Sequence, residues 1–267
     1  MVGSVPYVNA KPLNSYFEHL GQHSSVRVLY QVPSSLPALL DSGTAEAVLV
    51  SSFDSLRTPG RRIAAGCSIS TKADAQSVRL LSKVPIHGIQ SVALDSSSLT
   101  SVHLAQVVLA ESYGVRPEVR NMPPNQDDML AACDAALLIG DIGMLADGTG
   151  LIDLDMGAEW HKLTNLPFVW AAWIGRERLT PALAKELERA KLWGQAHLDR
   201  VVTQTQVQCK WPGDSCREYL TEIMNYDLTE DHLAGLKLFG ELLVKHGLLT
   251  EAHFPEIVAA ETTAMSV

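Results

Sequence analysis

The chain has 267 residues, of which 46% are hydrophobic and 19% are charged, a composition typical of a globular protein with one large or two small domains. Its formal net charge of −9 argues against a nucleic acid or an anionic membrane surface as the main partner, and no apolar run is long enough to cross a bilayer. The N-terminus shows no basic segment followed by an apolar run, so we expect a cytoplasmic protein.

The chain opens with the segment VGSVPYVNAKPLN, which we interpret as a loop because Pro6 and Pro12 interrupt it and Gly3 leaves its backbone unrestricted. Asn9 lies in the middle of this segment. From the residues alone, Asn9 is either a turn residue or a side chain that faces a ligand.

Short apolar runs rich in β-branched residues follow, and they alternate with helical patterns, which predicts buried strands. The predicted strands are residues 26–32, 46–50, 91–95, 134–140 and 166–174. Residues 34–43 predict a short helix, with Pro37 in its first turn and Gly43 at its end. This alternation favours an α/β fold with largely parallel sheets.

The last third of the chain is helical in pattern. Residues 181–202 and 230–247 have amphipathic spacing, and Gly247 is expected to end the second helix. We find no internal repeat and no long linker, which favours two lobes joined by crossing strands. We predict one discontinuous α/β lobe from residues 1–94 and 170–267, which includes the C-terminal helices, and an inserted α/β lobe from residues 95–169. The strands 91–95 and 166–174 would then form the hinge.

Small hydroxyl residues follow several predicted strands, and ligands of open α/β sheets bind beyond the carboxyl ends of strands. The hydroxyl residues are Ser51, Ser52, Ser77, Ser96, Ser97, Ser98, Thr100 and Ser101. For a single one of these residues, a helix cap or a turn is the more common role. The run between residues 95 and 101 has more hydroxyls than capping requires. Together with the free backbone N–H groups of a helix start, it favours a site for a small anion.

The common catalytic signatures are absent from the sequence, which has no G-x-S-x-G, G-x-x-x-x-G-K-[ST], G-x-G-x-x-G or H-E-x-x-H motif. The nine histidines lack ligand spacing, so we expect no metal site. Asp141 follows a predicted strand, where it is either a helix N-cap or a pocket residue. We expect free thiols at the four cysteines, Cys67, Cys133, Cys209 and Cys216.

Five segments carry a resemblance to a known family, in the order in which the family has them. They are VPYVNAKPL (5–13), SVRLLSKVP (77–85), LDSSSLTSVHL (94–104), DAALLIGD (134–141) and WHKLTNLPFVWAAW (160–173), with a weaker match over residues 219–239. In these segments the sequence resembles the chorismate dehydratases of the futalosine route to menaquinone, a family with the two-lobed type 2 periplasmic-binding-protein fold. It departs from the family pattern at Leu99, where the family has Arg, and at Asn165, where the family has Gly.

The resemblance implies a lyase that removes water from chorismate to give 3-[(1-carboxyvinyl)oxy]benzoate, without a metal or an organic cofactor. Asn9 matches the family's active-site Asn. An amide does not take up a proton at neutral pH, but it donates and accepts hydrogen bonds. The implied role of Asn9 is therefore to orient the substrate, whose own enolpyruvyl carboxylate takes the C3 proton. The implied substrate-binding residues are Tyr7, Ser52, Ser77, Ser98, Thr100, Ser101 and Asp141.

Two other functions remain open at this point. The first is a non-catalytic protein of the same fold that binds a small carboxylate, which the missing catalytic motifs favour and the Asn9 segment disfavours. The second is an enzyme similar to dihydroxynaphthoate synthase, which acts in the same pathway and shares the fold but differs in the opening segment.

Overall fold

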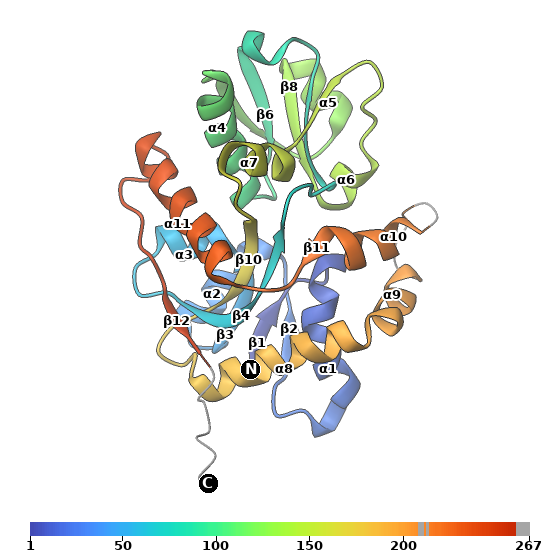
Figure 1. Cartoon of the computed structure of the whole chain (residues 1–267), viewed down its shortest axis with the longest axis vertical. Helices are drawn as coiled ribbons and strands as arrows, with labels where there is room; N and C mark the ends of the chain where they lie inside the picture. Colours follow the sequence, from blue (N-terminus) through green and yellow to red (C-terminus); the bar gives the residue numbers. More distant parts are fainter. Residues whose placement is uncertain (208–210, 212–213, 260–267) are drawn as a thin grey trace.

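The computed structural model describes residues 1–207, 211 and 214–259, which fold into two lobes, each built around one β-sheet (Figure 1). The larger sheet contains β1 (Val2–Ser4), β2 (Val28–Tyr30), β3 (Ala47–Ser51), β4 (Arg62–Thr71), β10 (Phe168–Gly175), β11 (Met224–Asn225) and β12 (Glu256–Val258). Its order is β11-β4-β10-β3-β1-β2, and β12 also pairs with β4. The smaller sheet contains β5 (Val78–Ser82), β6 (Ser91–Asp95), β7 (Glu118–Met122), β8 (Ala135–Ile139) and β9 (Ile152–Asp155), in the order β7-β6-β8-β5-β9.

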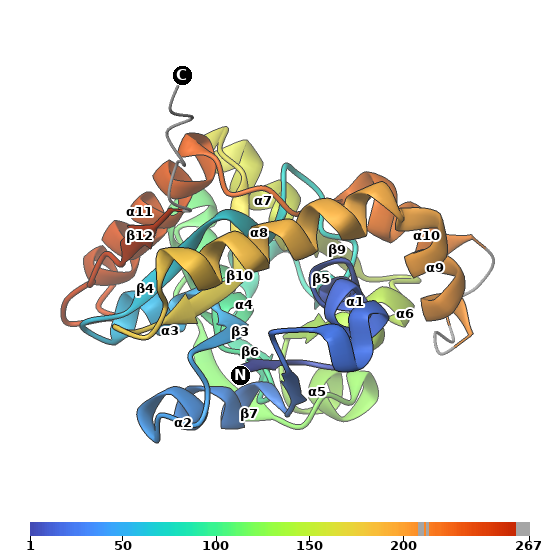
Figure 2. The ribbon, with the colours of Figure 1, turned by 90° about the horizontal axis from the view of Figure 1, so that it is seen from below.

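Helices pack against both sheets, and most of them belong to the larger lobe. Those of the larger lobe are α1 (Lys11–Leu20), α2 (Leu36–Asp41), α3 (Ser52–Arg57), α8 (Pro181–Ala196), α9 (Leu198–Gln206), α10 (Ser215–Glu218) and α11 (Glu230–Lys245). Those of the smaller lobe are α4 (Thr100–Tyr113), α5 (Gln126–Ala132), α6 (Gly140–Leu145) and α7 (Met156–Thr164). The long helix α8 runs beside α1 and across β4 (Figure 2). The predicted two-lobed α/β architecture is confirmed.

The sheets are mixed rather than largely parallel as predicted. β1, β2 and β3 are parallel to one another, and so are β6, β7 and β8. β10, however, is antiparallel to both β3 and β4, and β5 is antiparallel to β8 and β9. These antiparallel strands lie at the ends of the segments that cross between the lobes, where the chain changes sheet and reverses direction.

The inserted lobe begins earlier than the predicted residue 95. β4 belongs to the larger sheet and β5 to the smaller one, so the chain first crosses between the lobes at residues 72–77. It crosses back at residues 165–167, between α7 and β10. The predicted division therefore leaves β5 and β6 in the wrong lobe. The apolar pattern of a strand does not state which sheet the strand joins, because that depends on partners far away in the sequence.

Most predicted elements exist, with shifted ends. The strand 91–95 matches β6, whereas the strand 26–32 shortens to β2 and the helix 181–202 divides into α8 and α9 at His197. The opening segment is not one loop, since it contains β1, a 3-10 turn at Val8–Ala10 and the start of α1. Pro12 lies in the first turn of α1, where its missing N–H would have no helical partner.

Three aromatic side chains anchor the second crossing between the lobes. Trp160 on α7 meets Phe168 on β10 edge to face, with ring centroids 5.2 Å apart, and both rings contact Phe239 on α11. Asn165 ends α7 with a φ of +57°, a left-handed conformation that Gly and Asn adopt more readily than other residues. Asn165 therefore supplies the turn that this crossing requires.

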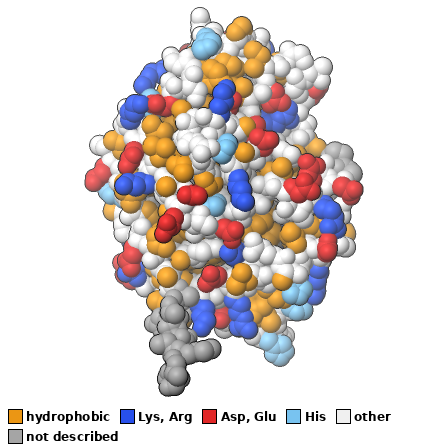
Figure 3. Space-filling model, in the orientation of Figure 1, with side chains coloured by type: hydrophobic (Ala, Val, Ile, Leu, Met, Phe, Trp, Pro, Cys, Tyr) orange, Lys and Arg blue, Asp and Glu red, His pale blue; other side chains and the backbone are white. Residues whose placement is uncertain are grey.

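The cysteines and the charged surface residues agree with what the sequence led us to expect. Cys67 and Cys133 are buried free thiols, as predicted, and burial raises the pKa of Cys67 to about 12, whereas Cys209 lies outside the described residues. On the face shown in Figure 3, acidic and basic side chains are interspersed. None of the helices in the described part of the chain combines the length and the apolar run that a bilayer-spanning segment requires.

Candidate functional site

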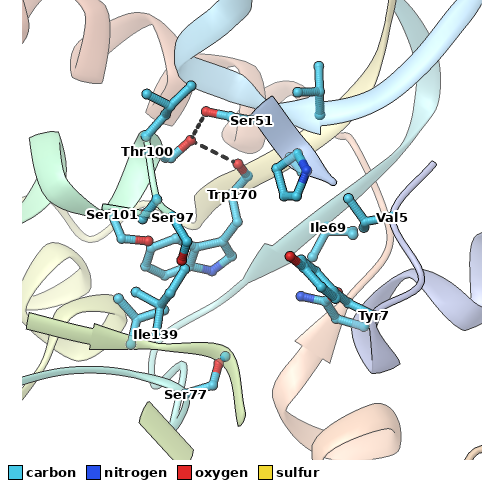
Figure 4. A pocket seen from close by; sticks show the side chains of 18 of the residues that line it. Val5, Tyr7, Ser51, Ile69, Ser77, Ser97, Thr100, Ser101, Ile139 and Trp170 are labelled. Carbon is cyan, nitrogen blue, oxygen red and sulfur yellow. Dashed lines mark hydrogen bonds between the residues drawn. The ribbon is translucent and has the colours of Figure 1, made fainter. Parts of the chain in front are cut away.

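A cleft between the two lobes brings most of the predicted site residues together (Figure 4). It is open to solvent, and the space within it and at its mouth together amounts to about 860 Å³. The predicted residues that line it are Tyr7, Asn9, Ser77, Ser98, Thr100 and Ser101. The segments that follow β1, β3, β6 and β8 all reach this cleft, because parallel strands place their carboxyl ends at the same edge of a sheet.

Thr100, the first residue of α4, joins the two lobes. Its hydroxyl donates to the backbone carbonyl of Trp170 on β10 at 3.1 Å, and it also hydrogen-bonds to the hydroxyl of Ser51 at the end of β3 (Figure 4). Since the proton of Thr100 is used by Trp170, Ser51 is the donor in the second bond. The Thr100 hydroxyl is thus occupied across the cleft, and its backbone N–H is the group that a ligand would meet.

Two other hydroxyls at the start of α4 have no such partner. No described residue hydrogen-bonds to the side chain of Ser98 or Ser101, and both line the cleft. The neighbouring Ser97 donates its N–H and its hydroxyl to the carboxylate of Asp95, at 2.8 and 2.6 Å, which fixes the turn that leads into the helix. The hydroxyls of Ser98 and Ser101, with the first N–H groups of this 14-residue helix, can therefore hold an anion.

Ser52 does not belong to the cleft, contrary to the prediction. Its side chain is fully buried, and its hydroxyl donates to the carbonyl of Val169 at 2.6 Å. Ser52 begins α3, and the chain turns away from the sheet edge at this residue, so that Ser51 lines the cleft instead.

Asn9, Ser77 and Tyr219 form a second polar cluster in the cleft. The hydroxyls of Ser77 and Tyr219 are 3.0 Å apart, and the Asn9 side chain also lies beside the Tyr219 hydroxyl. Burial raises the pKa of Tyr219 to about 12, although the contacts with Ser77 and Asn9 act in the opposite direction. The phenol therefore keeps its proton at neutral pH. The Asn9 carbonyl oxygen is buried and has no hydrogen-bond partner among the described residues.

Tyr219 was not identified from the sequence. It is the first residue of a π-helix, Tyr219–Ile223, and such helices occur frequently at functional sites. The weak match of residues 219–239 to the family was the signal that could have pointed to it.

Tyr7 and Asp141 lie in the outer part of the cleft. The Tyr7 side chain is 47% exposed, and its pKa is raised by partial burial and by the negative charges of Asp95 and Asp141. The N-cap interpretation of Asp141 is wrong, because Ile139 is the residue that precedes α6 and Asp141 lies within its first turn. Asp141 faces the outer cleft together with Asp95, which was not predicted.

No Lys, Arg or His occurs among the described residues that line the inner and outer parts of the cleft. Leu99, at the position of the family's Arg, lines the inner part. Hydroxyl and backbone N–H groups must therefore balance the charge of any bound anion. Within the described ranges, no three His, Cys, Asp or Glu side chains group together in a way that could hold a metal ion.

The chain is similar to proteins of one family over nearly its whole length. The family model described as menaquinone biosynthesis matches residues 1–245. The chain is 29% identical over 263 residues to a chorismate dehydratase of Thermus thermophilus, covering 91% of this chain and 94% of that protein. It is 26% identical over 244 residues to a chorismate dehydratase of Campylobacter jejuni, covering 89% of this chain and 94% of that protein.

The fold has counterparts among solved structures. A Candida albicans protein described as having the generic periplasmic binding protein fold superposes with a TM-score of 0.67 at 11% identity, covering 99% of this chain and 98% of that one. At this identity the similarity shows the fold alone, which is the predicted two-lobed fold of type 2 periplasmic binding proteins. Because the family model spans almost the entire chain, the protein belongs to the menaquinone biosynthesis family.

Proposed function

We propose that this protein is a chorismate dehydratase, a lyase that converts chorismate into 3-[(1-carboxyvinyl)oxy]benzoate and water. The observation that supports this most directly is the polar cluster of Asn9, Ser77 and Tyr219 in the cleft, whose amide and hydroxyl groups can donate to a carboxylate. The names of the two relatives point to the same reaction.

The reaction makes modest chemical demands on the protein. It removes the C3 proton and the C4 hydroxyl of the substrate, and the ring becomes aromatic as water leaves. The C3 proton is acidic because the ring carboxylate is conjugated to it through the C1–C2 double bond. In our proposal the enolpyruvyl carboxylate of the substrate takes this proton, so the protein supplies position and electrostatics rather than a strong base.

In this proposal, two parts of the cleft bind different groups of the substrate. The hydroxyls of Ser98 and Ser101 and the N–H groups of α4 bind one carboxylate of the substrate. Asn9 donates its amide N–H to the enolpyruvyl carboxylate and holds it over C3. Apolar side chains, including Val5, Ile69 and Ile139, line the space between and limit the access of water.

Replacing Ser101 with Ala should weaken the binding of chorismate or of the product. The loss should be about 1.5–3 kcal/mol if the hydroxyl donates to a carboxylate. Adding Thr100→Ala should increase the loss, because Thr100 also joins the lobes. Titration calorimetry measures both effects. Ser82→Ala is the matched control, since it removes a buried hydroxyl that bonds to the carbonyl of Val84, away from the cleft. An unchanged affinity in the double variant would place the anion elsewhere in the cleft.

The proposed function is tested by mixing the purified protein with chorismate and following the products by mass spectrometry. The expected product is lighter than chorismate by one water. Binding of chorismate without turnover would instead indicate a non-catalytic carboxylate-binding protein. Turnover of a later intermediate of the same pathway, with none of chorismate, would indicate an enzyme similar to dihydroxynaphthoate synthase.

A further inference from the structure

The backbone immediately before Ser77 is held in an unusual conformation. Gln76 has a φ of +57°, and the N–H of Ser77 donates to the carbonyl of Ala75 at 2.6 Å, which closes a three-residue turn. A turn of this kind at a residue other than Gly is rare and strained, and such strain persists only where the surroundings impose it. The turn ends at a cleft residue, so whatever holds Gln76 also sets the direction of the Ser77 hydroxyl.

One carboxylate, that of Asp155, holds this turn. It accepts hydrogen bonds from the N–H groups of Ala75 at 2.9 Å and Gln76 at 2.6 Å. It also accepts hydrogen bonds from the N–H groups of Gly157 at 2.8 Å and Ala158 at 3.0 Å, in the first turn of α7. Asp155 thus links the first crossing segment to the helix that leads to the second crossing.

The crossing segment and α7 approach each other as closely as their backbones allow. A Cβ atom at Gly157 would lie 2.3 Å from the carbonyl oxygen of Ala73, which is far inside van der Waals contact. The Asp155 carboxylate lies within this contact and is partly buried. Its position relative to the turn is therefore fixed by packing as well as by hydrogen bonds.

We propose that Asp155 is a positioning residue for the reaction in the cleft: it holds the strained turn at Gln76 and thereby keeps the Ser77 hydroxyl against Tyr219. The kinetic test of this inference rests on the proposed function. The hydrogen bonds from Ala75 and Gln76 to Asp155, which we call the clamp, are present whatever the function. Asp155 has two separable tasks. Capping α7 needs one short polar side chain, whereas holding the turn needs the second oxygen, Oδ2, which accepts from Gln76.

Asp155→Ser separates these tasks, because serine keeps an oxygen for the cap and loses the one that reaches Gln76. We expect kcat for chorismate to fall by about 100-fold with a much smaller change in KM, since the reacting groups are misplaced rather than removed. Thr180→Ala is the matched control. It removes the side-chain cap of α8, which accepts the N–H of Leu183, and should leave kcat unchanged.

A rescue experiment distinguishes positioning from general weakening of the fold. Glycine adopts a positive φ without strain, so Gln76→Gly should keep the turn without the help of Asp155. In the double variant Asp155→Ser/Gln76→Gly we expect at least about a tenfold recovery of kcat over Asp155→Ser. No recovery, or a kcat for Asp155→Ser within about twofold of the parent, would overturn the proposal.

Backbone amide exchange, followed by NMR, tests the clamp without reference to activity. The Gln76 amide should exchange at least about tenfold faster in Asp155→Ser, or in Asp155→Asn if the serine variant does not fold, than in the parent and in Thr180→Ala. Equal exchange rates would refute the clamp even in an active enzyme. A parent protein that does not turn over chorismate, but shows the expected exchange, would refute the proposed function and leave the clamp supported.

Discussion

Asn9→Ala should lower the kcat for chorismate by at least about 100-fold, because small errors in the position of reacting groups have effects of this size. The fold should be retained. The Asn9 carbonyl oxygen is buried without a partner, and an unsatisfied polar group of this kind costs about 1–3 kcal/mol. Removing it should leave the melting temperature unchanged or raise it. Loss of activity with retained stability is the combination expected of a functional side chain rather than a turn residue.

The matched control is Asn14→Ala, which removes another amide of the same segment. Asn14 is fully buried on α1 and donates to the Ser4 hydroxyl at 2.8 Å, and it does not line the cleft. We expect this variant to lose about 1 kcal/mol of unfolding free energy and to keep its kcat. Full activity in Asn9→Ala would show that Asn9 is only a turn residue.

Asn9→Asp tests whether the substrate or the protein supplies the base that takes the C3 proton. The new carboxylate would join Asp95 and Asp141 in a cleft whose described lining has no cation, and it would repel an anionic substrate. We therefore expect a large loss of kcat/KM. If this variant matched the parent and its rate gained a pH dependence near the pKa of a carboxylic acid, the protein would be the source of the base. The substrate-assisted reaction would then be wrong.

Arg61→Leu should have the largest effect on stability. Arg61 and Asp54 are each 1–3% exposed, and the Arg61 Nε lies 3.1 Å from the Asp54 Oδ2. Arg57 also donates to the Asp54 Oδ1, at 3.0 and 3.2 Å, so the carboxylate would lose one of its two cations. We therefore expect a cost at the lower end of the about 3–5 kcal/mol that breaking a buried ion pair takes. For a protein of this size, that should lower the melting temperature by about 5–10 °C. Thermal unfolding followed by circular dichroism measures the change.

Two further variants show whether the buried charge is the cause. Asp54→Asn in the Arg61→Leu background should recover part of the loss, because it removes a buried carboxylate that only Arg57 would still pair. Arg120→Ala breaks the exposed pair with Glu118 and should leave the melting temperature nearly unchanged. A melting temperature for Arg61→Leu equal to that of Arg120→Ala would mean that Asp54 and Arg61 do not stabilise the fold as a pair.

The sequence predicted those parts of the fold and the site that are encoded by neighbouring residues. β6 and the hydroxyl cluster after it were predicted correctly, since an apolar run followed by Asp95 and several serines is a local pattern. β4 was not predicted, because Gly66 and three serine and threonine residues interrupt its apolar pattern. Ser52 was assigned to the cleft because the sequence does not show where the chain turns away from the sheet edge.

The site residues that the sequence missed are those that depend on distant partners. Tyr219 meets Ser77 across 142 residues, and Asp155 reaches Gln76 across 79. Neither contact has a signature in the residues around it. The positive φ of Gln76 is equally invisible, because glutamine is not a residue type that indicates such a turn.

The hydrogen bonds of Thr100 to Ser51 and Trp170 also affect how ligands enter and leave the cleft. Separation of the lobes would break both hydrogen bonds. At about 0.5–1.5 kcal/mol each, the two bonds together favour the shut state by about 1–3 kcal/mol, or about 5- to 150-fold. Ligand exchange that requires the lobes to separate would then pass through a minor open population, and the two hydroxyls at the end of β3 and the start of α4 would slow it.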